Sequence, residues 1–219
     1  MSGYLDIETW NRRRQFEFFK DYHNPFFNIC SDVDVTELFG LTRATKGISF
    51  FIAYHFLSIR TANEVEPFRY RLRGDRVFVH DRIHAGSTLL LADENFAFVY
   101  FDYTEDFQVF HARAEAAVAS VKANPSSLHE RDAQDDLIYH SVIPWITFTS
   151  ISHARKGVGQ ESVPKIAFGK YRAQGGRIRM PVSVEAHHAL MDGLHVGRYF
   201  EKFESYLSNP RPALGLPAK

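Results

Sequence analysis

The chain lacks a second cysteine, because Cys30 is the only one among its 219 residues. A disulfide within the chain is therefore excluded, and a lone thiol is typical of proteins in reducing compartments. Long hydrophobic runs are also missing. The longest apolar stretches, near Ile48–Tyr54 and Leu89–Ala92, are too short to cross a bilayer, and residues 1–15 lack the apolar segment of a secretory signal. We therefore expect a cytoplasmic protein without membrane contact.

Net charge is absent as well, since 26 Lys and Arg residues balance 26 Asp and Glu residues. Binding to a nucleic-acid backbone depends on a positive field, so we expect no nucleic-acid partner. A chain of roughly 150–250 residues commonly folds as one domain, and 45% hydrophobic residues suffice for a large core. We expect a single domain over residues 1–208, followed by a C-terminal tail, 209–219, that frays at Gly215 and Pro217.

Five segments carry apolar residues at the three- to four-residue spacing of amphipathic helices. They are Ile7–Phe19, Thr36–Ala44, Ile48–Glu64, Glu105–Ala123 and Gly193–Leu207. Thr104 is the expected N-cap of the fourth helix, and Asn124-Pro125 is expected to end it.

Short β-type segments lie between these helices and are separated by turn residues such as Gly74-Asp75 and Gly175-Gly176. The segments are Phe26–Asp32, Phe68–Leu72, Val77–Asp81, Leu89–Ala92, Phe96–Asp102, Leu137–Thr147, Ile166–Arg172 and Ile178–Ala186. Hairpins mixed with long helices predict an α+β fold, a two-layer sandwich in which helices cover one face of a mixed, mostly antiparallel sheet. The run Phe96–Tyr103 is apolar on both faces, so we expect a second subunit to cover part of the sheet.

One stretch combines a strand end with polar residues suited to chemistry. His187 and His188 end a strand pattern, and Asp192-Gly193 opens the next helix. The histidine side chain has a pKa near 6.5 when nothing perturbs it, so at neutral pH its neutral imidazole can take a proton from a hydroxyl. The histidine pair therefore contains a candidate general base. The same residues with His195 could bind a metal, but no HExxH or Cys/His zinc spacing supports that reading, and we expect no metal. The other histidines are read as structural or solvated.

The chain contains HHALMDG followed by LHVGRYFEKFESYL, and this run resembles the C-terminal signature of the chloramphenicol acetyltransferase family. More distantly it resembles the acyltransferase cores of 2-oxo-acid dehydrogenase complexes. Trp10-Asn11-Arg12-Arg13 is similar to the opening segment of the family, and Ser141-Val142-Ile143-Pro144-Trp145 is similar to its Ser-x-x-Pro-Trp strand. The resemblance extends from Leu5 to Leu207 in the expected order.

This resemblance implies a homotrimer with active sites between subunits and an O-acetyltransferase acting on chloramphenicol or a related small molecule. His188 matches the base that deprotonates the acceptor hydroxyl in a ternary complex with acetyl-coenzyme A, a co-substrate rather than a bound cofactor. Ser141 matches the donor to the oxyanion, and such a donor lowers the barrier by about 3 kcal/mol. Asp192 matches a carboxylate that pairs with an arginine, here Arg12, and orients the site.

The resemblance also implies two sets of binding residues. Trp145, Lys170 and Tyr171 match the coenzyme A side, and Phe19, Phe96 and Ala167 match the acceptor side. Family members usually carry a tyrosine at the position of Phe19 and a threonine at that of Ala167. Two hydrogen-bonding groups are therefore missing, which weakens the case for chloramphenicol as the acceptor.

Three alternatives stay open at this point. A dihydrolipoamide-type acyltransferase core would share the motif, but such chains normally carry a lipoyl domain and a linker ahead of the core. A non-catalytic trimeric ligand-binding protein could keep the fold without the reaction. Cys30 could act as an acyl-enzyme nucleophile, although a free cysteine in a strand-like run is more often buried.

Overall fold

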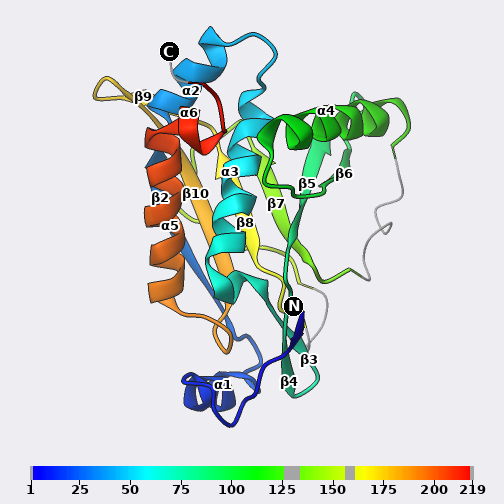
Figure 1. Ribbon diagram of the computed structural model, residues 1–219, viewed down its shortest axis with the longest axis vertical. Helices are drawn as coiled ribbons and strands as arrows, with labels where there is room; N and C mark the ends of the chain where they lie inside the picture. The colour runs from blue at the N-terminus through cyan, green and yellow to red at the C-terminus, as the bar shows by residue number, and fades with distance from the viewer. Residues whose placement is uncertain (1, 126–133, 156–160, 218–219) are drawn as a thin grey trace.

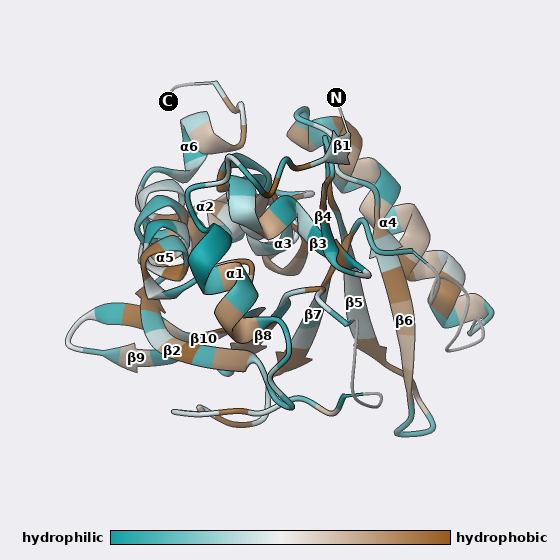
Figure 2. Cartoon of the chain, turned by 90° about the horizontal axis from the view of Figure 1, so that it is seen from below, coloured by the Kyte–Doolittle hydropathy of each residue, from teal (hydrophilic) through white to brown (hydrophobic). Residues whose placement is uncertain are grey.

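The computed structural model describes residues 2–125, 134–155 and 161–217. Helices pack on one face of a curved sheet and leave its other face free of helices, so the molecule has two layers (Figure 2). The predicted α+β class is confirmed. No helix in these ranges is both long and apolar enough to cross a membrane.

The main sheet has seven strands, with the order β2-β10-β8-β7-β5-β6 and with β9 paired to β10. β7 runs parallel to both β5 and β8, and the other pairs are antiparallel. The mixed, mostly antiparallel arrangement is therefore also confirmed. The strands are β2 (Phe26–Asp34), β5 (His84–Leu90), β6 (Phe96–Phe101), β7 (Leu137–Ile143), β8 (Lys165–Gly169), β9 (Arg172–Gln174) and β10 (Arg177–His187).

The helix layer is centred on α3, which is buried along most of its length (Figure 1). Ser49 caps α3 by accepting a hydrogen bond from the backbone N–H of Ile52. Asp106 caps α4, so the expected N-cap at Thr104 is wrong; the Asp106 carboxylate accepts from two backbone N–H groups of the first turn. The helices of this layer are α2 (Thr36–Ala44), α3 (Phe50–Glu64), α4 (Phe107–Ala123), α5 (Gly193–Ser208) and α6 (Pro210–Ala213).

A small second sheet and α1 (Arg13–Phe19) lie at the N-terminal end of the molecule (Figure 1). The sheet has the order β1-β4-β3, and the 3₁₀ helix Glu66–Arg69 precedes β3. α1 begins later than the predicted Ile7, because the chain before it continues the pairing with β4 through Leu5 and then packs Trp10 on Tyr70. The strands are β1 (Gly3–Tyr4), β3 (Tyr70–Arg73) and β4 (Arg76–Val79).

One further predicted boundary is corrected. β7 ends at Ile143 rather than at Thr147, because the following residue, Pro144, has no N–H to donate to a ladder. Within the expected C-terminal tail, α6 follows α5 directly, and Ala213 and Leu214 are buried. Arg60 of α3 donates to the carbonyl oxygen of Ala213 at 2.7 Å, so α6 packs against the helix layer.

A buried polar network ties the helices to the sheet. Nε2 of His55 lies 2.9 Å from Oγ of Ser87 in β5. Oγ of Ser58 lies 3.1 Å from Nε2 of His140 in β7 and 2.7 Å from Oη of Tyr199 in α5. Because His140 points toward the helices, the next residue of β7 points toward the open face of the sheet.

Candidate active site

His188 lies immediately after β10, and its backbone N–H donates to the carbonyl oxygen of Pro25 at 2.7 Å. Its ring stacks on Phe19, with 4.0 Å between ring centroids and an interplanar angle of 4°, and contacts Phe27 at 4.7 Å. The residue is partly exposed, whereas its Nδ1 atom is buried and has no hydrogen-bond partner among the described residues. The accessible edge of the ring is therefore the one that carries Nε2, the edge suited to taking a proton.

An ion pair supports the turn that carries this histidine. Arg12 contacts the carboxylate of Asp192, and its Nη2 donates to the carbonyl oxygen of His188 at 3.3 Å. Asp192 also caps α5, because its carboxylate accepts from the backbone N–H of Leu194, and Nδ1 of His195 accepts from the Asp192 N–H. Burial opposes ionisation of Asp192, but the hydrogen bond and charge of Arg12 outweigh it and lower the pKa of the carboxyl. A charged pair thus fixes the backbone of the candidate base.

The first histidine of the pair is in a different environment. His187 is buried, its Nδ1 accepts from the backbone N–H of Ala189 at 3.2 Å, and its ring meets Phe26 edge-on. Burial, together with the electrostatic effect of the neighbouring Arg155 and His188 side chains, lowers the pKa of His187 to about 4. This ring is neutral and structural at neutral pH, so the geometry favours His188 as the base.

Ser141 does not lie beside His188 within one chain. Ser141 of β7 is in register with Ala167 of β8, and Ala167 is in register with Ser183 of β10. From Ser183, His188 is five positions further along the chain, about 16 Å away, and Ser141 is two strand spacings, about 10 Å, to the side. One chain therefore carries the two candidate groups on separate parts of the sheet.

The acceptor-side residues are similarly divided. Phe19 contacts His188, and Ala167 is buried beside Ser141 on the sheet face that the helices leave free. Phe96 is 51% exposed on β6, the edge strand opposite β2, about 19 Å across the sheet from β10. These residues do not form one pocket in a single chain.

The residues expected on the coenzyme A side do lie together. The backbone N–H of Lys170 donates to the carbonyl oxygen of Ile146 at 2.8 Å, which brings the segment after β7 beside the end of β8. Trp145 is 59% exposed, and the exposed ring of Tyr171 packs against Phe39 at 5.0 Å. The three side chains are available to a ligand at the surface.

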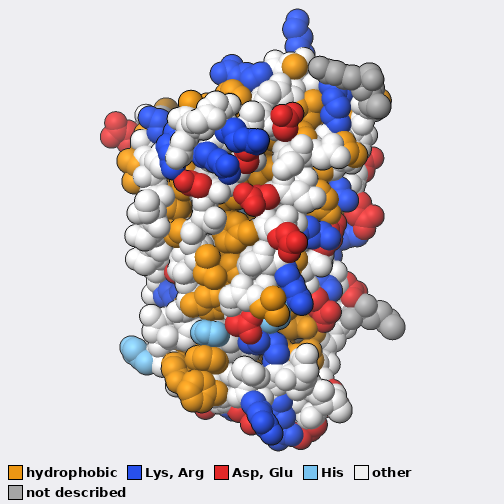
Figure 3. Space-filling view, turned by 90° about the vertical axis from the view of Figure 1, so that its left-hand side faces the viewer, with side chains coloured by type: hydrophobic (Ala, Val, Ile, Leu, Met, Phe, Trp, Pro, Cys, Tyr) orange, Lys and Arg blue, Asp and Glu red, His pale blue; other side chains and the backbone are white. Residues whose placement is uncertain are grey.

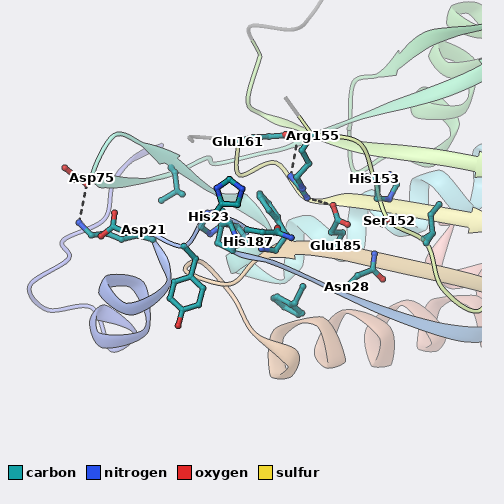
Figure 4. A pocket seen from close by; sticks show the side chains of 18 of the residues that line it. Asp21, His23, Asn28, Asp75, Ser152, His153, Arg155, Glu161, Glu185 and His187 are labelled. Atoms are coloured by element: carbon teal, nitrogen blue, oxygen red, sulfur yellow. Dashed lines mark hydrogen bonds and ion pairs between the residues drawn. The ribbon is translucent and has the colours of Figure 1, made fainter. Parts of the chain in front are cut away.

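A cavity of about 900 Å³ opens at the His187 end of β10 and was not predicted from the sequence (Figure 4). Its wall includes His23, His153, Arg155 and Glu185 from three separate segments. The one signal in the sequence was Glu185, a charged residue between the apolar residues Val184 and Ala186 near the end of a strand. Among the residues that the model describes, no group of three or more His, Cys, Asp or Glu side chains is arranged to hold a metal.

Aromatic side chains also gather at the α1 end of the molecule. Phe18 and Tyr22 are both exposed and pack against Phe19 at 4.9 and 5.2 Å between centroids. Figure 3 shows hydrophobic side chains grouped at this end, close to a histidine. The surroundings of His188 are therefore open to the surface and largely apolar on the α1 side.

The chain shares its fold with solved proteins described as acetyltransferases. The fold is shared with the dihydrolipoamide acetyltransferase of Azotobacter vinelandii, with a TM-score of 0.65 and 20% identity over 93% of this chain and 88% of that one. A solved chloramphenicol acetyltransferase is more similar, with a TM-score of 0.87 and 30% identity over 94% of this chain and all of the other.

The sequence comparisons identify the particular family. The family model described as chloramphenicol acetyltransferase matches residues 2–204. Chloramphenicol acetyltransferases of Klebsiella sp. and Proteus mirabilis are 26% and 23% identical to this chain, covering 94% and 92% of it and 94% and 93% of their own lengths. The chain belongs to the chloramphenicol acetyltransferase family and is an acyltransferase of that family.

Proposed function

We propose that the chain is an acetyl-coenzyme A-dependent O-acetyltransferase that acetylates a hydroxyl of chloramphenicol or of a related small molecule. The observation that carries this proposal is the partly exposed ring of His188, stacked on Phe19 and supported by the Arg12–Asp192 pair. A base held in one orientation needs little reorganisation when the reaction begins.

The reaction follows from that geometry. Nε2 of His188 takes the hydroxyl proton while the hydroxyl oxygen attacks the thioester carbonyl, giving a tetrahedral oxyanion. Collapse of this intermediate breaks the carbon–sulfur bond, and the coenzyme A thiolate takes the proton back from His188. The products are the acetyl ester and free coenzyme A, and the imidazole is neutral again.

The oxyanion donor is proposed to come from a second copy of the chain. Ser141 is partly exposed and lies on the sheet face without helices, far from His188 of its own chain. We therefore propose a homotrimer with each active site between two subunits, where His188 of one faces Ser141 of the next. A fixed hydroxyl at the developing charge lowers the barrier by about 3 kcal/mol.

Acetyl-coenzyme A is proposed to bind where Trp145, Lys170 and Tyr171 are exposed together. The ammonium group of Lys170 suits the phosphates, and the aromatic rings provide flat apolar surfaces for the adenine. Because Trp145 and Tyr171 are exposed in the single chain, contact with this ligand would bury them.

A thiol-release assay with acetyl-coenzyme A and chloramphenicol tests the activity. Thiol release above background that requires both substrates and His188 supports the proposal, and absence of release with any hydroxyl acceptor overturns it.

Mixed assemblies test the shared site. We expect His188→Ala and Ser141→Ala each to be nearly inactive alone. Co-expressed with different tags and purified as mixed trimers, they restore activity at about a third of the sites, because one of the three interfaces in each mixed ring then has both wild-type groups. No recovery in isolated mixed trimers would show that both groups act within one subunit. Full activity of Ser141→Ala alone would show that Ser141 has no catalytic part.

A further inference from the structure

Two histidines flank the candidate base, and the ring of each accepts a hydrogen bond from the backbone of the turn that carries it. Nδ1 of His187 accepts from the N–H of Ala189 at 3.2 Å, and Nδ1 of His195 accepts from the N–H of Asp192 at 3.1 Å. A ring nitrogen that accepts carries no proton, so each neutral ring holds its proton on Nε2. The proposed reaction uses neither ring to move a proton.

The other backbone N–H groups of the turn, residues 188–192, are also paired. The His188 N–H donates to the carbonyl oxygen of Pro25 at 2.7 Å. The carbonyl oxygen of His187 accepts from the N–H of Leu190 at 3.0 Å and from that of Met191 at 3.2 Å. Every backbone N–H of the turn therefore has an acceptor, and two of these acceptors are imidazole nitrogens. Loss of either nitrogen would leave an N–H of this turn without its acceptor.

The Asp192 carboxylate is a competing partner for His195. Its Oδ1 atom lies 2.9 Å from Nδ1 of His195, and a protonated Nδ1 would donate to it. That carboxylate already accepts from Arg12 and from the N–H of Leu194, whereas the N–H of Asp192 can only donate. Burial outweighs the charge of Asp192 and lowers the pKa of His195, and burial is also the main cause that lowers the pKa of His187 to about 4. Both rings are therefore neutral at neutral pH and available as acceptors.

We propose that His187 and His195 are positioning residues that hold the turn of His188 through their Nδ1 atoms. The inference rests on the proposed function, because both residues act through the proposed base. A shift of the turn would move Nε2 of His188 away from the acceptor hydroxyl, and a misplacement of about 1 Å can cost roughly 10²-fold in rate. Substrate binding depends on other side chains, so the effect should fall on kcat rather than on KM.

Alanine and amide variants test the two acceptors. His187→Ala and His195→Ala remove the ring nitrogen and are expected to lower kcat about tenfold, with the KM of both substrates within about twofold of wild type. His187→Asn and His195→Gln supply an amide oxygen instead and should restore kcat to within about threefold of wild type. Glutamine at the third position of a helix bonds the N-cap N–H in a capping box, and asparagine bonds the N–H two residues further along, as His187 does at Ala189.

His111→Ala is the matched control. Nε2 of His111 accepts from the backbone N–H of Ser49 at 2.9 Å, so this variant breaks the same kind of hydrogen bond at the N-terminus of α3. It should lower the free energy of unfolding and leave kcat within about twofold of wild type. A fall in kcat as large as that of the two alanine variants would show that loss of stability alone explains their effect, and it would overturn the inference.

Nitrogen NMR spectra of the imidazole rings add a readout that does not depend on turnover. At neutral pH we expect the proton on Nε2 in both rings, and a proton on Nδ1 of His195 would show donation to Asp192 and overturn its role. Wild-type thiol release that both alanine variants leave unchanged overturns this inference and leaves the proposed function standing, whereas no release by wild type with any hydroxyl acceptor overturns both. His187 is buried, so if its alanine variant unfolds, the variants of the partly exposed His195 decide the outcome.

Discussion

The histidines buried between the helices and the sheet are held by different contacts from the histidine at the end of β10. His55 and His140 are fully buried, hydrogen-bond to serines through Nε2, and have lowered pKa values because burial penalises the charged ring. His188 is partly exposed and is held by stacking on Phe19 and by its backbone carbonyl rather than by a serine hydroxyl bonded to its ring. Burial with a hydrogen-bond partner makes an imidazole structural, whereas an exposed ring edge leaves it available for proton transfer.

Removal of the exposed imidazole is expected to have the largest effect on activity. His188→Ala is predicted to lower kcat by about 10²- to 10⁴-fold, because a general base of this kind contributes that much. The free energy of unfolding should change little, since the ring packs only against aromatic side chains at a partly exposed position. Thiol release measures the change in kcat, and urea unfolding of the same preparation measures the change in stability. Retention of more than a tenth of kcat would show that His188 is not the general base.

Acid is expected to lower the stability of the fold through the buried His140. Burial lowers the pKa of His140 to about 4 from an unfolded value near 6.5. The unfolded chain therefore binds a proton that the folded chain does not, so this contribution to stability is complete above pH 6.5 and is lost as the pH falls toward 4. The loss is about 3 kcal/mol at pH 4.

Urea unfolding at pH 7, 5.5 and 4 measures this loss, and His140→Gln supplies the comparison because it cannot titrate. The variant should lose less stability over the same pH range. Identical pH dependence in both proteins would contradict the assignment.

Asp192→Asn is expected to have an intermediate effect on both stability and turnover. It leaves the Arg12 guanidinium, which is 11% exposed, without its charged partner, and loss of this partly buried pair costs about 2 kcal/mol. We also expect a tenfold lower kcat with little change in KM, because the carbonyl of His188 loses its support. Glu17→Gln, which breaks the exposed pair with Arg13, is the control and should leave the free energy of unfolding unchanged within error, because exposed ion pairs contribute little to stability.

Ser58→Ala is expected to give the smallest effect and to act on stability alone. It removes the hydroxyl that joins His140 to Tyr199 and leaves both buried groups without that bond, at a cost of about 1–2 kcal/mol. Turnover should stay within twofold of wild type at 25 °C. A large fall in kcat without a fall in stability would show that the buried network acts on Ser141.

Local periodicity was sufficient for most of the regular structure. Thr36–Ala44 was predicted and is the observed extent of α2, because its apolar spacing and its packing face agree. α1 was predicted to begin too early and α6 was not predicted, because non-local contacts decide both: strand pairing through Leu5 delays α1, and burial of Leu214 orders the chain after α5. Such contacts leave no periodic signal in the sequence.

The sequence by itself determined the fold class, the family and the histidine motif, because these depend on residue types at fixed short spacings. Only the tertiary structure decided which distant groups meet. It paired Arg12 with Asp192, separated Ser141 from His188 in one chain, and placed Arg155 against Glu185 in a cavity wall. Strand order and register set these distances, and they arise from packing between segments that lie far apart along the chain.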